Sequence, residues 1–386
     1  MIQFKSAALT LCLCALLPLH GAATEQARVD VGNVVTRTVG PLMQRYRIPG
    51  MAVGIAVNGH TYIYDYGVAS KTTAAPVTSA TLFEIGSVTK TFTATLASYA
   101  QLTGKISLSD SVSSDLPALR GSSFDRVSLL NLGTHTAGGL PLQVPDGITT
   151  DDQLMAYLQR WKPTYSPGTY RVYSNVSIGL LGLIVAQRMN HNFDTLMQTT
   201  LFGPLGLKHT YLDVPAAQMA NYAQGYTSKD LPIRMTPGVL GPEAYGIRTT
   251  AGDLLAFLAA NMHMLDLDAT LQRALTDTHT GYYRVGAMTQ DLIWEQYRYP
   301  VTLEQLHEGN STKMLFDANP VTALDPPSPP QSDVILNKTG STNGFSTYVA
   351  FIPEKKIGIV LLANKSYRID ARVSAAYAIL TQLEGR

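Results

Sequence analysis

Strand-like runs stand near both ends of this 386-residue chain and constrain its fold more than any other feature. Close to the N-terminus, residues 51–57 and 61–68 flank Asn58-Gly59, a dipeptide that favours the tight turn of a two-stranded hairpin. Close to the C-terminus, further strands are predicted over residues 334–339, 345–352 and 357–362. Because short consecutive strands pair antiparallel, we expect the two groups to share one antiparallel sheet.

Helical patterns flank these strands. Apolar residues recur at helical spacing over residues 25–46, until Pro49-Gly50 breaks the pattern, and again over residues 371–383. The segment between the two ends has a mainly helical or loop-like pattern. The sequence therefore predicts an α/β fold of the α+β type: an antiparallel sheet built from the N- and C-terminal segments, flanked by terminal helices, with an all-helical region inserted.

This arrangement divides the chain into two interleaved regions. We expect residues 24–84 and 201–386 to form the α/β region and residues 85–200 to form the mainly helical region. The active site should lie at their junction, where clefts between regions commonly bind ligands. A Pro-rich piece at residues 325–330 is expected to be an exposed loop.

Residues 1–23 have the three parts of a secretory signal peptide: Lys5, an apolar run over residues 7–19, and the small residues Gly21-Ala22-Ala23. We predict cleavage after Ala23 and a periplasmic protein. No later stretch is long and uncharged enough to span a bilayer, so no stable membrane anchor is expected. Both cysteines of the chain lie inside the signal, so no disulfide is expected either.

Charge and histidine placement argue against several classes of function. The formal net charge is +1 and becomes 0 once the signal lysine is removed, so neither nucleic acid nor another polyanion is indicated as a partner. The eight histidines are scattered, without H-x-H or H-E-x-x-H spacing, so we expect no metal site and no cofactor. A monomer is the default oligomeric state.

Ser87 and Lys90 form the first chemical motif. Apolar positions after Gly86 recur at helical spacing up to Gly104, so we expect Ser87 to open a buried helix. Residues three apart share a helix face, which would place the Lys90 ammonium beside the Ser87 hydroxyl and activate it. The unpaired N–H groups of a helix N-terminus would also suit an oxyanion. The alternative is an N-capping serine followed by a solvated lysine.

Two further motifs follow along the chain. Tyr173-Ser174-Asn175 stands ahead of an apolar run, where the alternatives are a core tyrosine and a helix-capping asparagine. Lys338-Thr339-Gly340 ends a predicted strand, where an edge lysine can simply oppose aggregation. A phenol ionises near pH ~10, and ammonium groups from Lys90 and Lys338 would favour the phenolate of Tyr173 as a base. Whether Tyr173 or Lys90 takes the first proton stays open, because the cluster titrates as a unit.

The ordered set of motifs in an exported protein resembles the penicillin-recognising serine hydrolases, which share S-x-x-K and K-T-G elements. More closely, the chain from about Ile48 to Leu383 resembles a class C β-lactamase, a cephalosporinase. The phrases that carry this resemblance are Phe83-Glu84-Ile85-Gly86-Ser87, Tyr173-Ser174-Asn175, Asn337-Lys338-Thr339-Gly340-Ser341-Thr342-Asn343-Gly344-Phe345 and Leu362-Ala363-Asn364-Lys365.

The resemblance implies a role for each matching residue. Ser87 would be the acylated nucleophile, Lys90 and Tyr173 would handle its proton, and Lys338 would meet the substrate carboxylate. The backbone N–H groups of Ser87 and Ser341 would form the oxyanion hole. The expected substrate-binding residues are Gln143, Asn175, Tyr245, Thr339, Gly340 and Arg372.

Three positions depart from the usual family pattern. Ile369 stands where the family often has an asparagine near the carboxylate subsite, Ser346 where glycine is common, and His135 where tyrosine is common. These departures leave the substrate profile less defined than the reaction type.

The predicted function is the hydrolysis of β-lactam antibiotics, favouring cephalosporins, through a serine acyl-enzyme. The alternative is a D-alanyl-D-alanine carboxypeptidase or an esterase on the same scaffold. Esterases of this kind often lack the K-T-G lysine, so Lys338 argues against an esterase. A non-catalytic cell-wall binding protein is a further hypothesis, and the intact set of Ser87, Lys90, Tyr173 and Lys338 argues against it.

Overall fold

The computed structural model describes residues 19–384, and the side chains of the first helix from residue 26 onward. Most of the predicted signal peptide, with both cysteines, lies outside the described residues. No helix within residues 19–384 is long and apolar enough to cross a membrane.

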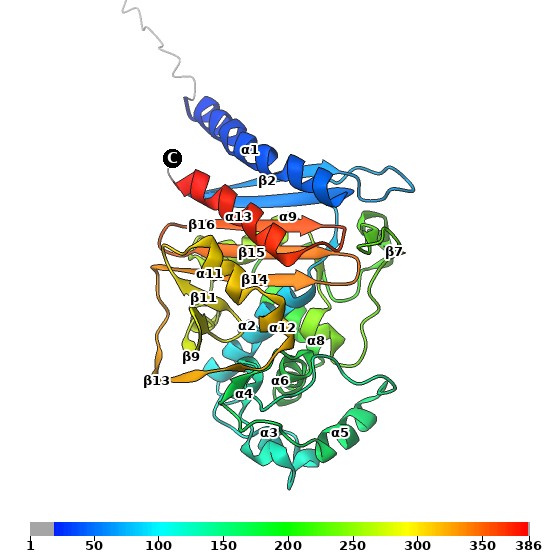
Figure 1. Cartoon of the computed structure of the whole chain (residues 1–386), viewed down its shortest axis with the longest axis vertical. Coiled ribbons are helices and arrows are strands. Elements are labelled where there is room, and N and C mark those ends of the chain that lie inside the picture. The colour runs from blue at the N-terminus through cyan, green and yellow to red at the C-terminus, as the bar shows by residue number, and fades with distance from the viewer. Residues whose placement is uncertain (1–18, 385–386) are drawn as a thin grey trace, which may run out of the picture.

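An antiparallel sheet of nine strands runs through the middle of the molecule (Figure 1). The strands nearest the two chain ends meet inside it, because β1 pairs with β16 and places Ile55 opposite Ile359. The prediction of one antiparallel sheet built from both ends of the chain is therefore confirmed. In order across the sheet, the strands are β13 (Thr322–Ser328), β9 (Gly281–Val285), β10 (Met288–Gln290), β11 (Glu295–Arg298), β14 (Val334–Ser341), β15 (Ser346–Ile352), β16 (Ile357–Ala363), β1 (Gly50–Val57) and β2 (His60–Gly67).

Strand β1 shows why the sheet forms the central layer. All of its residues are buried, and successive side chains point to opposite faces. Met51, Val53 and Ile55 enter one apolar core, whereas Ala52 and Ala56 enter the other. The turn to β2 uses Asn58 and Gly59 at positive φ (52° and 77°), as the predicted hairpin requires.

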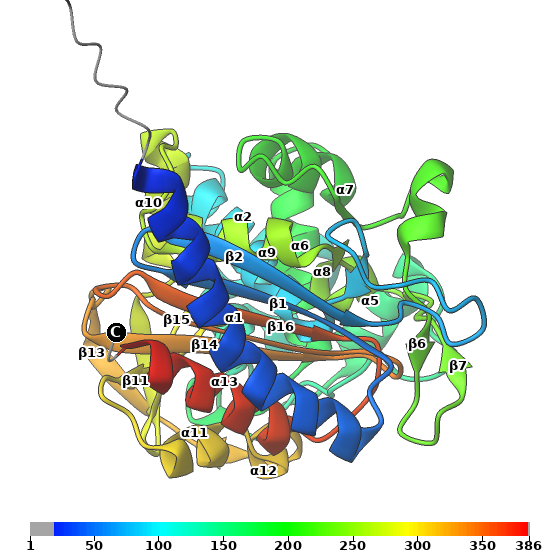
Figure 2. The same cartoon turned by 90° about the horizontal axis from the view of Figure 1, so that it is seen from above.

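The two terminal helices cover one face of the sheet. Helix α13 (Ile369–Glu384) packs on β15 and β16 and against α1 (Leu19–Tyr46), and α11 (Leu303–Gly309) packs against α13. Figure 2 shows α1 and α13 side by side across the strands. This confirms that the terminal helices flank the sheet.

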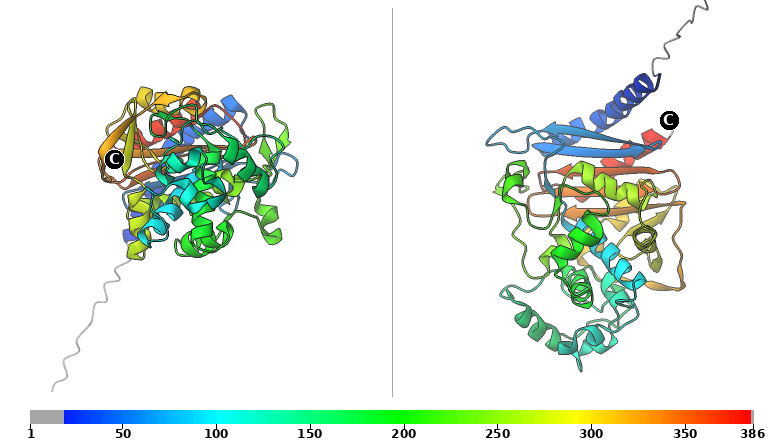
Figure 3. Two further views of the ribbon diagram at one scale, coloured as in Figure 1. Left: turned by 90° about the horizontal axis from the view of Figure 1, so that it is seen from below. Right: turned by 180° about the vertical axis from the view of Figure 1, so that it is seen from behind.

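The other face carries a larger helical layer, which Figure 3 shows from below and from behind. Helix α9 packs on β1 and β16, and α2 packs against α6, α8 and α10. The predicted boundaries of the two regions stay predictions. The remaining α-helices within residues 19–384 are α2 (Thr89–Leu102), α3 (Val112–Asp115), α4 (Leu129–Gly133), α5 (Asp151–Arg160), α6 (Asn175–Arg188), α7 (Phe193–Leu196), α8 (Gly241–Tyr245), α9 (Ala251–Asn261), α10 (Ala269–Asp277) and α12 (Thr312–Phe316).

Three small sheets tie loops around the larger elements. They pair β3 (Phe83–Glu84) with β8 (Arg248–Thr249) and β8 with β5 (Thr210–Tyr211), β4 (Tyr170–Arg171) with β12 (Asn319–Pro320), and β6 (Gly225–Tyr226) with β7 (Pro232–Ile233).

Strands β9, β10 and β11 extend the main sheet and lie within residues 201–386, the range predicted to belong to the α/β region. One expectation is wrong. The Pro-rich piece at residues 325–330 falls largely in β13 rather than in a loop. Proline is tolerated there because β13 is an edge strand whose pairing with β9 is irregular between Ala323 and Ser328.

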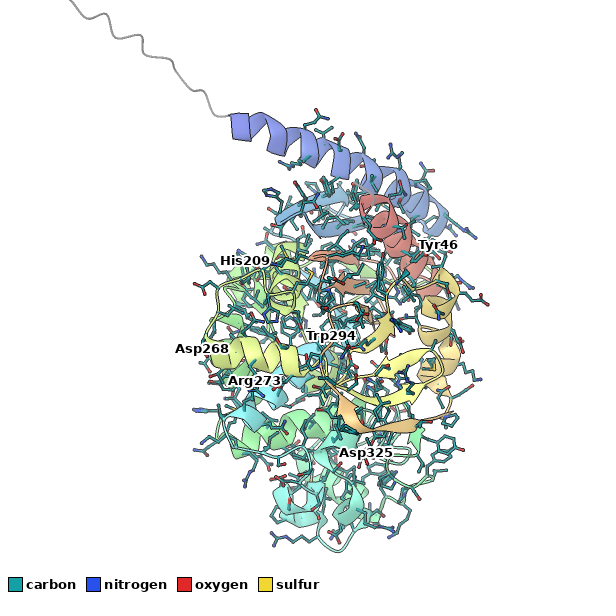
Figure 4. All side chains as sticks on the ribbon, turned by 90° about the vertical axis from the view of Figure 1, so that its left-hand side faces the viewer. Tyr46, His209, Asp268, Arg273, Trp294 and Asp325 are labelled. Atoms are coloured by element: carbon teal, nitrogen blue, oxygen red, sulfur yellow. The ribbon has the colours of Figure 1, made fainter. Side chains whose placement is uncertain are left out.

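Asp291 is an uncompensated buried carboxyl beside the sheet. It begins the turn from β10 to β11, where its backbone N–H donates to Trp294 O at 3.0 Å. Neither carboxyl oxygen has a hydrogen-bond partner among the described residues. Burial therefore raises the pKa of Asp291 well above its ordinary value. The neighbouring Trp294 lies in the middle of the molecule (Figure 4).

We predict that Asp291→Asn stabilises the protein at neutral pH. The carboxyl ionises near pH ~3.9 in the unfolded chain but stays protonated in the fold, so unfolding is increasingly favoured as the pH rises above that value. Thermal unfolding should show a gain of several degrees at pH 7, at roughly 2 °C per kcal/mol for a chain of this size, and a shrinking gain toward pH 4.

The matched control is Asp266→Asn, because Asp266 is exposed. It should leave the melting temperature nearly unchanged at each pH. A gain for Asp291→Asn that is equal at pH 4 and pH 7 would contradict the argument from ionisation.

Candidate active site

Ser87 lies on a single 3₁₀ turn, Gly86–Val88, between β3 and α2. The expectation that Ser87 opens the α-helix is wrong, because Ser87 lies on the preceding 3₁₀ turn and α2 begins two residues later, at Thr89. The turn is held on both sides: the Ile85 N–H donates to Ile247 O at 3.1 Å, and Thr89 Oγ1 accepts from the Ile247 N–H at 3.1 Å. Ser87 is therefore presented on a fixed turn.

Lys90 reaches Ser87 as the spacing predicts. Its Nζ donates to Ser87 Oγ at 2.8 Å and to the Ala244 carbonyl oxygen of α8 at 2.8 Å. The side chain is fully buried. Burial and, to a smaller extent, the Lys338 cation lower the pKa of Lys90, Tyr173 opposes them, and the net value is about 8. A lysine with this pKa is partly neutral near pH 8 and is therefore able to accept a proton.

Tyr173 is placed between cationic groups. It precedes α6, whose N-cap is Ser174: the Ser174 Oγ accepts from the Ser177 N–H at 3.0 Å. The centroid of the Tyr173 ring lies 5.2 Å from Lys90 Nζ and 5.0 Å from Lys338 Nζ. The structure thus brings both lysines to one phenol.

The charges around Tyr173 decide its ionisation. Burial alone would raise the pKa of Tyr173, but the ammonium groups of Lys338 and Lys90 more than offset this effect and lower the pKa below its ordinary value. The hydroxyl has no hydrogen bond of regular geometry among the described residues, although Ser87 is close enough to lower the pKa further.

Lys338 lies where an interior strand gains a free edge. Strand β14 is flanked by β11 and β15, but its last residue paired with β11 is Asn337, opposite Glu295. From Lys338 to Ser341 only β15 pairs with it. Lys338, Thr339 and Ser341 therefore line the cavity on an open stretch of backbone.

Glycines let this strand approach the Ser87 turn. Gly86 has φ +51°, and a Cβ at that position would lie 2.6 Å from Ser341 N. A Cβ on Gly340 would overlap the carbonyl oxygen of Ile85. Side chains larger than hydrogen would separate the two segments. The contact places the Ser341 backbone beside Ser87.

Arg372 supports this strand from behind. Its guanidinium, buried in α13, donates to the carbonyl oxygen of Gly340, to Thr347 O at 3.0 Å and to Ser341 Oγ at 2.7 Å. Burial lowers the pKa of Arg372 to about 10. Arg372 is not among the residues that line the cavity, so its contact with substrate stays a prediction.

Four of the six predicted binding residues, Gln143, Asn175, Tyr245 and Thr339, line two adjoining cavities, whereas Gly340 and Arg372 line neither. Gln143 and Asn175 line both, whereas Tyr245 lines only the second. Ile369, one of the departures from the family pattern, lines the first. The first cavity is bounded by Ser87, Leu142, Gln143, Arg171, Tyr173, Asn175, Glu295, Gly309, Asn310, Ser311, Met314, Leu315, Lys338, Thr339, Ser341 and Ile369.

Sequence reasoning missed Arg171 and Glu295. Glu295 Oε1 accepts from Arg171 Nη2 at 3.0 Å and from Lys338 Nζ at 3.3 Å, and all three side chains are buried. Arg171 Nε also donates to Gln290 Oε1 at 2.6 Å. The available signal was Arg171, two residues before Tyr173, whereas Glu295 lies between the charged residues Asp291 and Arg298 and gave no local signal.

Among the described residues, no three histidine, cysteine, aspartate or glutamate side chains lie together as a metal site would need. The site brings together the Ser87 hydroxyl, the Lys90 amine that is hydrogen-bonded to it, the Tyr173 phenol with its lowered pKa, and the free edge of β14. Together these groups are equipped for nucleophilic acyl transfer.

We predict that Glu295→Gln destabilises the fold. The substitution removes the carboxylate that Arg171 and Lys338 share, and an uncompensated buried charge costs about 3 to 5 kcal/mol. Chemical denaturation should show a lower unfolding midpoint. Glu354→Gln, at an exposed turn position, is the matched control and should change the free energy of unfolding by less than about 0.5 kcal/mol. Equal stability of the two variants would show that the cations do not depend on Glu295.

Comparisons with known proteins agree with this geometry. A family model described as beta-lactamase matches residues 35–384. A beta-lactamase of Pseudomonas fluorescens is 51% identical over 355 residues, which cover 92% of this chain and 99% of that protein.

Two solved structures are similar over almost the same length. A class C beta-lactamase in complex with cefoxitin has 54% identity and a TM-score of 0.90, covering 92% of this chain and 99% of that one. A D-alanine carboxypeptidase from Burkholderia cenocepacia has 56% identity and a TM-score of 0.88, with the same coverage. On its sequence and its fold, the chain belongs to the β-lactamase family and resembles its class C members.

Proposed function

We propose that this protein hydrolyses β-lactam antibiotics through an acyl-enzyme formed on Ser87. The observation that carries the proposal is the bond from Lys90 Nζ to Ser87 Oγ, with the Tyr173 ring held between Lys90 and Lys338. A serine hydroxyl needs such a neighbouring base, because its own pKa is far too high for attack unaided.

In the acylation step, Ser87 Oγ attacks the β-lactam carbonyl carbon while its proton passes to the Lys90–Tyr173 pair. The carbonyl oxygen becomes an oxyanion, which the backbone N–H groups of Ser87 and Ser341 would bind. The C–N bond of the ring then breaks, and its nitrogen takes the proton back from the pair. The product is an ester on Ser87.

Deacylation requires the same pair to act a second time. A water molecule must lose a proton to a base as it attacks the ester carbon, and Ser87 Oγ then leaves as the hydroxyl. The lowered pKa of Tyr173, caused by the two ammonium groups, supports its phenolate as the acceptor of that proton. The lowered pKa values of both Lys90 and Tyr173 therefore support one proton-transfer unit.

Substrate recognition is proposed for the rest of the site. Lys338 and Thr339 lie on the open edge of β14, suited to a carboxylate. Gln143 and Asn175 offer amide groups where the two cavities meet, and Tyr245 lines the second cavity. Gly340 and Arg372 would keep the strand in place.

The similarity to the class C structure that holds cefoxitin supports a preference for cephalosporins. The similarity to a D-alanine carboxypeptidase supports the second candidate, a D-alanyl-D-alanine carboxypeptidase. Both functions share the acylation step and differ in how fast water removes the acyl group.

Export to the periplasm is proposed from the signal-like residues 1–23. Cleavage after Ala23 would remove only the first turn of α1, which projects beyond the sheet (Figure 1). A monomeric state stays a prediction.

The test of function is a turnover experiment. The mature protein is mixed with an excess of a chromogenic cephalosporin, and product release is followed together with the intact mass. We expect many turnovers per protein and an adduct that disappears with the substrate. Turnover of ~10 to 10³ per second, against an adduct that lasts hours, corresponds to a barrier difference of about 7 kcal/mol. One stoichiometric burst with a stable adduct would favour the carboxypeptidase.

Two variants test the residue roles in the same experiment. Ser87→Ala should form no adduct and keep the wild-type melting temperature, because the change removes one partly buried oxygen. Tyr173→Phe should slow turnover by roughly 100-fold or more, because a general base is lost. Undiminished labelling of Ser87→Ala would disprove the nucleophile assignment.

We further predict that Lys338→Met shifts the acid limb of the pH profile. The base form of Tyr173 exists above its pKa, so activity falls as the pH drops through that value. Removing the Lys338 cation raises the pKa of Tyr173 and therefore moves the acid limb to higher pH. For substrates with a carboxylate, kcat/KM should also fall roughly 10- to 100-fold, as expected for a lost charged hydrogen bond of about 1.5 to 3 kcal/mol.

The matched control is Lys162→Met, which removes an exposed lysine. It should leave the pH profile and kcat/KM unchanged. If Lys338→Met behaves like this control, Lys338 has neither role.

A further inference from the structure

His135 holds the chain on both sides of Tyr173. Its backbone carbonyl accepts a hydrogen bond from the Val172 N–H at 2.9 Å. Its ring Nδ1 accepts from the Ser174 N–H at 3.3 Å. The residue before Tyr173 and the residue after it are therefore both bound to His135.

The His135 ring also packs on Tyr173 directly. The two ring centroids are 4.4 Å apart, with the planes tilted by 44°. Both side chains are buried. His135 thus limits the position of the phenol ring as well as that of its backbone.

His135 carries out these contacts as a neutral ring. Because Nδ1 accepts a hydrogen bond, the proton of the neutral imidazole must be on Nε2. Burial lowers the pKa of His135 well below its ordinary value, and the nearby cations Arg171, Lys90 and Lys338 lower it further. His135 therefore adds no fourth positive charge to the cluster around Tyr173.

Histidine is not the residue that stability alone would favour here. Its Nε2 is buried without a hydrogen-bond partner among the described residues, which carries an energetic cost. Its backbone has φ +60°, in the left-handed region, which histidine adopts more readily than most side chains, so the unpaired nitrogen is the cost that remains. A phenylalanine would fill the same space without the unpaired nitrogen. The distinguishing property of histidine is the Nδ1 acceptor.

We propose that His135 is a positioning residue for the hydrolysis described above, whose Nδ1 bond to Ser174 fixes the Tyr173 ring between Lys90 and Lys338. The inference rests on the proposed function of Tyr173 as part of the base. If the Ser174 N–H loses its acceptor, the phenol moves relative to both ammonium groups. A displacement of about 1 Å from a reacting geometry costs roughly 100-fold in rate.

The groups that set the ionisation of Tyr173 make the effect measurable. Lys338, Lys90 and Ser87 lower the pKa of Tyr173, whereas burial and Glu295 raise it. Arg171 lies 5.4 Å from the ring, measured from Cζ to the centroid. Any shift of the ring away from Lys90 and Lys338 raises the pKa and moves the acid limb to higher pH.

The experiment compares His135→Phe with His135→Asn. Phenylalanine keeps an aromatic ring but removes the acceptor, whereas the asparagine Oδ1 takes the place of Nδ1 and asparagine tolerates positive φ. We expect His135→Phe to lower kcat roughly 10- to 100-fold and to move the acid limb upward. His135→Asn should keep the limb close to that of the wild type. A wild-type limb for His135→Phe, or equal shifts for both variants, would overturn the proposal.

A buried histidine away from the nucleophile provides the structural control. His279 bonds to Asn261 Oδ1 at 2.9 Å and packs near Trp294, so His279→Phe should lower the melting temperature and leave the pH profile unchanged. If His279→Phe moves the acid limb of the pH profile as far as His135→Phe does, the proposal is overturned, because any destabilising substitution in the core would then produce the shift. The position of the limb does not depend on the fraction of folded protein wherever that fraction is constant over the pH range, so the profile is measured at a temperature at which each variant stays folded at every pH.

A spectroscopic readout separates this inference from the proposed function. Tyrosinate absorbance in the near ultraviolet is titrated in the wild type and in His135→Phe, each minus its Tyr173→Phe counterpart. We expect Tyr173 to ionise at higher pH in His135→Phe, whether or not the protein turns over a cephalosporin. Identical titrations would overturn the positioning role even in an active enzyme.

Discussion

Three buried cations gather around one phenol ring, and the site depends on how their repulsion is balanced. Lys90, Lys338 and Arg171 lie 5.0 to 5.4 Å from the Tyr173 ring, and Glu295 accepts bonds from two of them. A single carboxylate leaves an excess of positive charge that favours the phenolate. Burial lowers the pKa of Lys90 and of His135, and neighbouring cations lower both further. Burial and one electrostatic imbalance together therefore shift the protonation of the groups beside Ser87.

The fold supplies the rigidity that such an imbalance requires. Ser87 stands on a turn fixed by Ile247, Lys338 stands on a nine-stranded sheet, and Tyr173 precedes a capped helix. Charges of like sign would move apart on flexible loops. Here the three cations lie on regular elements: Lys90 on α2, Lys338 on β14 and Arg171 on β4. Their mutual repulsion therefore changes pKa values instead of moving the side chains apart.

Much of the fold and of the site could be predicted from local patterns in the sequence. The Asn58-Gly59 hairpin and the three C-terminal strands are signalled within a few residues, and so is the three-residue step from Ser87 to Lys90. The role of Glu295 could not be predicted, because it depends on the pairing of β11 with β14, which brings Glu295 close to Lys338. Strands β9 to β11 are short, and Gln290 of β10 and Glu295 of β11 enter a buried ion network, so the usual alternation is missing from β10 and β11. That the free edge of β14 begins at Lys338 is likewise a property of the register between strands.

The pairing of β1 with β16 also governs when this chain can fold. Gly50 N donates to Asn364 Oδ1 at 2.8 Å, joining residues 314 positions apart. A ribosome must therefore complete nearly the whole polypeptide before the middle of the sheet can close. Contacts of such long sequence separation form slowly, because a large loop has to be closed first. A nascent chain of this topology therefore cannot complete its central sheet until synthesis is almost finished.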